Sequence, residues 1–241
     1  MLNSYLPPMM TSSRRLIAIF TGHRFAIMLA SLLALLLVAP LFGSDPKSEA
    51  EVAMIFSVVV AGLAATSRRR TLALALAVGW VLLVWLRPFS AGMVSSLLID
   101  LVLFGLCCLA VESALRRALG SAAIDAEEIC AAVSAYLLLG IAWAALYSSL
   151  YAIDAAAFSG SKIASTEAWS SLLYFSFSTL TTLGYGDITP ASPTARAWAA
   201  AEAVSGTFYL AILIAHLVSN FRAERKVQAK PIESSPRGLR Q

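Results

Sequence analysis

The sequence predicts an all-α integral membrane protein with six transmembrane helices and one re-entrant helix. Three observations support this prediction. Of the 241 residues, 59% are apolar and only 13% are charged, whereas soluble domains carry about 25% charged residues. The apolar residues gather in long segments of helical length. The connection between the last two segments contains a further apolar stretch that is too short to cross a bilayer.

Six apolar segments are expected to cross the membrane. A spanning helix needs about 20 residues, with a range of roughly 17–25, so the second and third segments are marginal by length. The stretch TSRRRT between them is typical of a tight hairpin whose arginines reach the membrane interface. The six expected helices cover residues 25–42, 52–66, 71–86, 92–111, 129–151 and 197–221.

Lysine and arginine residues indicate on which side of the membrane each loop lies. With the N-terminus inside, every inner loop holds more basic residues than its outer neighbours, as the positive-inside rule requires. Both termini are therefore expected in the cytoplasm. The net charge of +4 reflects this topology and not a basic patch, so the expected partners include membrane lipids and no nucleic acid. The inner basic residues include Arg14, Arg15, Arg24, residues 68–70, Arg116 and Arg117.

The stretch TLTTLGYGDITP, residues 179–190, interrupts the apolar pattern. It overlaps the end of the apolar, aromatic stretch 168–182, which is expected to enter and leave the membrane from one side. Irregular backbone at membrane depth survives only where it is buried in protein or lines a water-filled path. Gly184 and Gly186 can adopt positive φ at little cost, which turns successive carbonyls toward one axis. This predicts a column of oxygens for a dehydrated cation, and four copies of the chain must close the ring.

The stretch TTLGYGD resembles the selectivity filter of potassium channels. The flanking stretches YLLLGIAWAALY and EAVSGTFYLAILIAHLVSNF resemble the outer and inner helices of small bacterial potassium channels of the ion-channel family. The resemblance covers about residues 128–221, and the earlier helices share only number and hydrophobicity with the family. It implies a homotetrameric channel that conducts K⁺ passively in a bacterial inner membrane, with no enzymatic activity and no cofactor besides the permeant ion.

The resemblance also implies roles for individual residues of the filter. Leu183 stands where valine is commoner, but its backbone carbonyl is the group that binds. Tyr174 and Phe175 stand where many relatives have a tryptophan pair, and we hypothesise that the Tyr174 hydroxyl bonds to Asp187. The expected K⁺ ligands are Thr182, Leu183, Gly184 and Tyr185, with Gly186 and Asp187 at the outer end. The expected supports of the filter are Thr181, Tyr174, Ser178 and Glu202.

The inner helix contains a glycine and a carboxylate that each allow two interpretations. Gly206 is either a gating hinge or a site of close helix packing. Glu202 projects toward the pore helix and is either a functional group or a buried acid satisfied by hydroxyls such as Ser178 or Ser205. The resemblance makes four further residues cavity-lining: Thr207, Leu210, Ile214 and Val218.

Four divisions of the chain follow. Residues 1–24 form a cytoplasmic segment, 25–120 a peripheral four-helix bundle, 121–222 the pore domain and 223–241 a short disordered cytoplasmic tail. The segment from Arg116 to Glu128 is expected to lie along the inner interface as a linker.

Residues 92–111 contain no lysine or arginine, so conventional voltage gating is not expected, and no gating ligand is identifiable. The alternatives are a non-selective cation channel, which the intact Gly-Tyr-Gly argues against, and a non-conducting pore-fold protein with an assembly or regulatory role.

Overall fold

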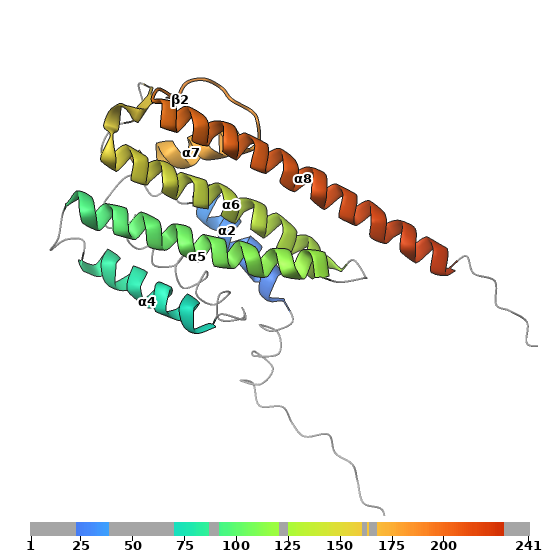
Figure 1. Cartoon of the computed structure of the whole chain (residues 1–241). Coiled ribbons are helices and arrows are strands. Elements are labelled where there is room, and N and C mark those ends of the chain that lie inside the picture. Colours follow the sequence, from blue (N-terminus) through green and yellow to red (C-terminus); the bar gives the residue numbers. More distant parts are fainter. Residues whose placement is uncertain are drawn as a thin grey trace, which may run out of the picture.

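The computed structural model describes residues 23–38, 70–86, 92–120, 125–160, 163 and 168–228. Within these residues the chain forms six α-helices, one short 3-10 helix and two very short strands (Figure 1). The helix expected over 52–66 lies outside the described residues. The helices are α2 (Arg24–Val38), α4 (Arg70–Leu86), α5 (Met93–Gly120), α6 (Ala126–Ile153), α7 (Ala168–Leu180) and α8 (Pro193–Gln228). The shorter elements are η3 (Ala155–Ala157), β1 (Phe158–Ser159) and β2 (Thr189–Pro190).

Three of the described helices are long and apolar enough to cross a membrane. They are α5, α6 and the Pro193–Asn220 part of α8, whereas α2 and α4 are shorter apolar helices. These lengths support a membrane protein, and the count of six spans stays a prediction.

The boundaries of α5 and α6 differ from those expected. The helix expected to end at residue 111 continues to Gly120, so the expected interfacial linker is largely helical. The apolar run does end near residue 111, but Glu112 and Arg116 form an i,i+4 ion pair at 2.7 Å that supports further turns. The next helix then begins at Ala126, because the Asp125 side chain caps it by accepting from the backbone N–H of Glu128 at 2.8 Å.

The inner helix also extends beyond its expected bounds. It begins at Pro193, where the Ser192 hydroxyl accepts from the backbone N–H of Ala195 at 3.1 Å. Serine followed by proline is a strong helix start, which an apolar pattern alone does not reveal. The helix ends at Gln228, so the first part of the expected disordered tail is helical, and residues 229–241 lie outside the described residues.

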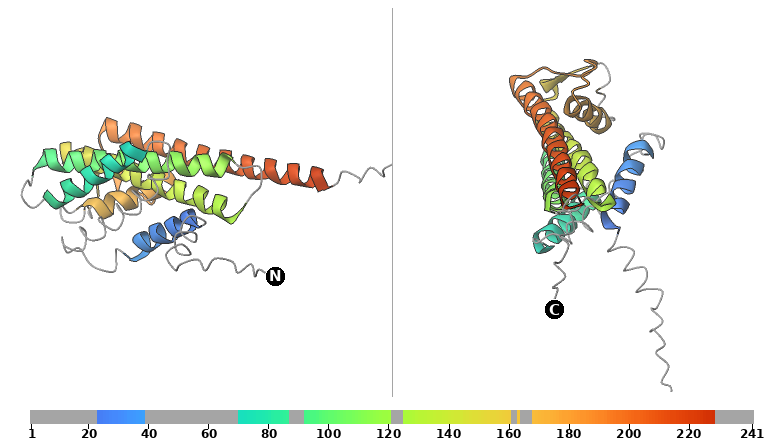
Figure 2. Two further views of the ribbon diagram at one scale, coloured as in Figure 1. Left: turned by 90° about the horizontal axis from the view of Figure 1, so that it is seen from below. Right: turned by 90° about the vertical axis from the view of Figure 1, so that its right-hand side faces the viewer.

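The main core lies between α5 and α6, which run side by side (Figure 1). It is built largely from alanines, which let the two backbones approach closely. Both views of Figure 2 place α2 and α7 beside α6, on the side that α5 leaves open. Helix α6 is therefore the central support of the bundle. Its fully buried core residues include Ala131, Ala135 and Leu138, which lie in one cluster with Ala110 and Ala114 of α5.

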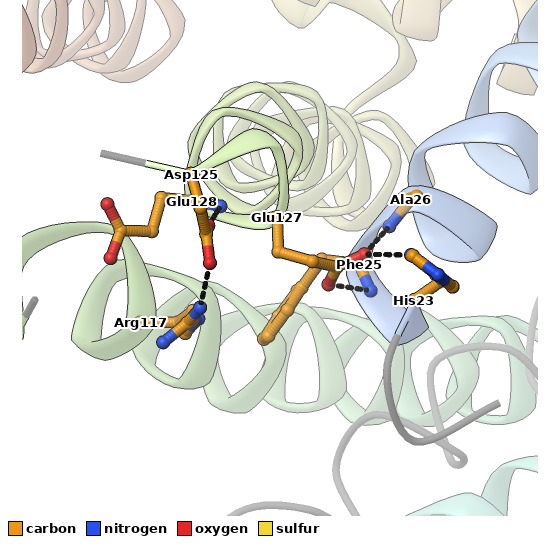
Figure 3. Close-up of polar contacts among 7 residues, drawn as sticks. All are labelled: His23, Phe25, Ala26, Arg117, Asp125, Glu127 and Glu128. Carbon is orange, nitrogen blue, oxygen red and sulfur yellow. Dashed lines mark hydrogen bonds and ion pairs between the residues drawn. The ribbon is translucent and has the colours of Figure 1, made fainter. Parts of the chain in front are cut away.

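One end of α6 is joined to α2 and α5 by polar contacts (Figure 3). The Glu127 carboxylate accepts from the backbone N–H groups of Phe25 and Ala26 at 3.1 and 3.3 Å. A carboxylate at a helix N-terminus satisfies free N–H groups and interacts favourably with the helix dipole. Arg117 of α5 pairs with Asp125 at 2.8 Å. The start of α6 thus fixes the N-terminus of α2 and the C-terminal part of α5.

Candidate functional site: the loop between α7 and α8

The loop begins where α7 ends, and Thr182 forms that end. Thr182 has φ of 58°, and its N–H donates to the Thr179 carbonyl at 2.9 Å. The N–H of Leu183 donates to the Ser178 carbonyl at 2.8 Å. These two bonds around a left-handed residue are a Schellman motif, the usual way to close a helix C-terminus. The first residue of the expected filter is thus also the residue that ends α7.

Positive φ recurs at every second residue through the loop. Thr182, Gly184 and Gly186 have φ of 58°, 56° and 80°, and no other described residue has positive φ. The expectation of left-handed Gly184 and Gly186 is confirmed. The positive φ of Thr182 was not expected, because a β-branched residue is uncommon in this region. Alternation of left- and right-handed residues turns successive carbonyls the same way, so the loop can present a row of oxygens.

The groups that this loop offers to a cation are the hydroxyl of Thr182 and the backbone carbonyls that follow it. No cluster of three or more His, Cys, Asp or Glu side chains with metal-binding geometry occurs among the residues that the structure describes. Neutral oxygens of this kind suit a monovalent cation that has lost its water.

The outer end of the loop is attached to α7 by a tyrosine. The Tyr174 hydroxyl donates to Asp187 Oδ1 at 3.1 Å, which is the contact expected from the sequence. The ring of Tyr174 also stacks on that of Tyr185, with centroids 6.4 Å apart and planes 5° apart. Tyr174 therefore contacts both the outermost expected ligand and the aspartate that ends the loop.

A second attachment of the outer end comes from the segment after α6. Strand β1 pairs antiparallel with β2, and the Ser159 and Thr189 hydroxyls lie 3.0 Å apart. Gly160, the residue after β1, lies so close to the loop that an added Cβ would stand 2.8 Å from the Asp187 carbonyl oxygen. Ile188 is buried with Tyr147 and Phe158 in an aromatic cluster. The residues after the loop are thus fixed to the end of α6.

The side chains of Leu183 and Tyr185 are uncovered within one chain. They are 56% and 68% exposed, so their own subunit leaves most of each side chain uncovered. Large apolar side chains that one chain leaves exposed are expected to contact lipid or other chains.

Two of the expected supports, Ser178 and Thr181, lie at the C-terminal end of α7. Ser178 is buried, and its carbonyl accepts from the N–H groups of Leu183 and Gly184 at 2.8 and 3.1 Å. Thr181 is exposed, and its hydroxyl donates back to the Phe177 carbonyl of its own helix at 2.6 Å. Ser178 therefore touches the inner half of the loop directly, whereas the Thr181 side chain completes the end of α7.

Glu202 of α8 is fully buried between α6 and α7. The Tyr147 hydroxyl donates to its Oε2 at 2.5 Å, and the Ser176 hydroxyl oxygen lies 2.5 Å from its Oε1. The carboxyl group is therefore satisfied by hydroxyls, but Ser178 and Ser205 were the wrong candidates. Ser205 instead donates to the Glu202 backbone carbonyl at 2.8 Å. Sequence reasoning missed Tyr147 because it lies on another helix, 55 residues away.

Gly206 packs against the end of α7. An added Cβ would stand closer to the Leu180 carbonyl oxygen than any unstrained contact allows, and 3.0 Å from Leu180 Cδ1. The same carbonyl accepts from the Tyr136 hydroxyl at 3.2 Å, so both neighbouring helices contact the last turn of α7. The geometry favours close packing at Gly206, and α8 runs through it without a break.

The four expected cavity-lining residues are exposed in the single chain. Exposure extends beyond them, because Val204, Phe208 and Ile212 of α8 are also more than half exposed. Most of the surface of α8 is therefore apolar and unpaired within one subunit. The four residues are Thr207, Leu210, Ile214 and Val218.

The geometry agrees with the comparison to known families. Residues 135–223, from α6 through the loop to α8, match the model of a family described as ion channel. No characterised protein and no solved structure matched the chain. The match covers the elements that form the candidate site and not α2, α4 or α5. The helix–loop–helix segment is thus similar to an ion-channel family, and this similarity supports an ion channel, a transporter-type protein.

Proposed function

We propose that the chain is one subunit of a potassium-selective channel that conducts K⁺ passively through a homotetrameric pore. The observation that carries the proposal is the alternation of positive and negative φ from Thr182 to Gly186. This backbone can present four successive oxygens on one side, as a filter that replaces the hydration shell of K⁺ requires. The proposed ligands are the oxygens of Thr182, Leu183, Gly184 and Tyr185, with Asp187 at the outer mouth.

The tetramer is supported by what one chain leaves uncovered. Leu183 and Tyr185 lie in the loop, and their side chains are largely exposed in one chain. One loop can form only one wall of an ion path. Closed rotational symmetry repeats the same contact around an axis. Four copies would complete the ring of oxygens and bury these two side chains. In this arrangement α8 lines the inner cavity, with Thr207 and Ile214 on the expected cavity face.

The two alternatives differ in their flux. A non-selective cation channel would pass K⁺ and Na⁺ alike, and a non-conducting pore-fold protein would pass neither. The intact Gly184-Tyr185-Gly186 favours selectivity. Conventional voltage sensing is not proposed, since α5 carries no basic residue before Arg116.

The test is ion flux into proteoliposomes that contain the purified full-length protein, with K⁺ compared against Na⁺ and Ba²⁺ as the blocker. The control is Gly184→Asp, which places a charged side chain on a left-handed residue of the filter. We expect K⁺ flux that exceeds Na⁺ flux, that Ba²⁺ stops and that the substitution abolishes. Equal K⁺ and Na⁺ flux would favour the non-selective alternative. Absence of flux across a range of pH and lipid composition would refute conduction by this chain alone.

A further inference from the structure

The contacts of Glu202 determine where its proton lies. The Ser176 hydroxyl oxygen lies 2.7 Å from the Gly140 carbonyl oxygen and 2.5 Å from Glu202 Oε1. Both contacts have hydrogen-bond length, so each needs a hydrogen between its oxygens. A carbonyl only accepts, and serine carries a single hydroxyl hydrogen. If Ser176 donates to Gly140, the hydrogen of the second contact must come from Glu202.

The remaining contacts agree with this count. The Tyr147 hydroxyl donates to Glu202 Oε2 at 2.5 Å, so that oxygen is an acceptor and Oε1 bears the proton. Glu202 forms no ion pair with any cationic side chain in the part of the chain that the structure describes. A buried carboxylate without a cation is strongly disfavoured, and more so at membrane depth. A carboxylic acid meets both conditions, because it is neutral and has one donor and one acceptor.

We infer that Glu202 is held as a neutral carboxylic acid that donates to Ser176, and that in this form it is a positioning residue between α8 and the pore helix. The consequence for the filter rests on the proposed function. Ser176 lies one turn before Leu180 on α7, and Glu202 lies one turn before Gly206 on α8. The acid therefore provides a second contact between α8 and α7. This contact is polar and lies one turn from the contact of Gly206 with Leu180, near the start of the filter.

Helix α6 completes the arrangement. An added Cβ at Gly140 would stand 2.8 Å from the Phe177 ring, so α6 and α7 approach closely enough for Ser176 to reach the Gly140 carbonyl. The chain of hydrogen bonds then runs from Glu202 through Ser176 to Gly140, with Tyr147 returning from α6 to Glu202. One proton thus links three helices.

The pH dependence of this contact has a definite sign. Loss of the proton removes the donor to Ser176 and leaves a buried charge, so the contact is stable at neutral pH and is lost as pH rises. Two titratable side chains of α6 face the acid, Tyr147 and Tyr136. Tyr136 is the one that also contacts the end of α7. Among the described residues, α7 contributes the non-titrating Ser176 and no charged partner to this carboxyl.

The first test is infrared spectroscopy of the full-length protein in lipid at neutral pH. The spectrum of Glu202→Gln is subtracted from that of the wild type. Glu112→Gln is the matched control, because the Glu112 side chain is partly exposed and paired with Arg116. We expect the first difference to contain the carbonyl stretch of a protonated acid and the second to contain only carboxylate bands. Carboxylate bands alone at Glu202 would overturn the inference.

Two further variants keep the inference testable if Glu202→Gln does not fold. Ser176→Ala removes the acceptor of the acid proton and should move the carbonyl stretch to higher frequency. A band that stays in place would overturn the proposed donor. Thermal unfolding gives the second readout: the wild-type midpoint should fall as pH rises into the alkaline range, while that of Glu202→Gln should not follow this fall, since the amide keeps a donor and an acceptor. Parallel pH profiles would contradict the positioning role.

These readouts do not depend on ion conduction. A protonated band in a protein that passes no K⁺ would leave the inference standing and reject the proposed function. Carboxylate bands in a protein with selective flux would do the reverse.

Discussion

Gly206→Ala separates the two interpretations of the glycine in α8 because they predict opposite signs. If Gly206 only provides a hinge, alanine stiffens the helix and stabilises the folded protein by about 0.5–1 kcal/mol. If Gly206 is a packing site, the new methyl group collides with the last turn of α7. The structure favours the collision, since the added Cβ would overlap the Leu180 carbonyl oxygen.

The size of the effect follows from what the methyl group would meet. The obstacle is backbone, and its carbonyl is also held by the Tyr136 hydroxyl at 3.2 Å, so it cannot turn aside as a flexible side chain would. Helix α8 must move away from α7 instead. Overpacking of this kind costs about 1–3 kcal/mol. With a mid-range cost of about 2 kcal/mol and a helix-propensity gain of about 0.5–1 kcal/mol, we expect a net loss of about 1–1.5 kcal/mol, or roughly a factor of 10 in the unfolding equilibrium.

The assay is denaturant or thermal unfolding in detergent, with Gly79→Ala as the control. Gly79 lies within α4, and an added Cβ there meets nothing within 4 Å, so alanine should stabilise by about 0.5–1 kcal/mol. We expect the two substitutions to shift the midpoint in opposite directions. If Gly206→Ala raises the midpoint as Gly79→Ala does, the packing argument is wrong and the hinge interpretation gains support.

Three further predictions concern the filter and the start of α6. Tyr174→Phe keeps the ring stack but removes the bond to Asp187, so flux should decline faster with time than in the wild type; an unchanged time course would refute support by this hydroxyl. Gly184→Ala should lower subunit stability by about 1–2 kcal/mol, since alanine is strained at φ of 56°, and a neutral effect in unfolding would contradict the assigned backbone. Glu127→Gln should cost about 0.5–1 kcal/mol, because the N-terminus of α2 loses a negative cap; equal midpoints would show that the charge is unimportant.

The sequence predicted the loop well because its backbone demands are local. Gly184 and Gly186 are the residues that adopt positive φ most easily, and both do so. The bond from Tyr174 to Asp187 was also foreseeable, since Asp187 ends the motif and Tyr174 lies in the helix that leads into it. The left-handed Thr182 was not foreseeable, because it comes from the end of α7 and not from the preference of threonine.

Contacts between distant helices were the part that the sequence could not supply. A buried acid satisfied by hydroxyls was one of the two interpretations of Glu202, but the hydroxyls suggested for it were those of Ser178 or Ser205. Tyr147 and Ser176 lie on α6 and α7, and only the packing of three helices brings them to the carboxyl group. The end of α5 was missed for a related reason: the segment from Arg116 to Glu128 was expected to be an interfacial linker, and the Glu112–Arg116 ion pair that supports the longer helix was not foreseen.

The double role proposed for Thr182, as the end of α7 and as a K⁺ ligand, restricts which residues this position can accept. Glycine would relieve the left-handed backbone but would remove the hydroxyl, and valine would keep the shape but lose the oxygen. Serine would retain the oxygen with less branching at Cβ. We therefore expect only threonine and serine to survive in a library of substitutions at this position that is selected for both assembly and K⁺ flux. Selection for either property alone would admit many more residues.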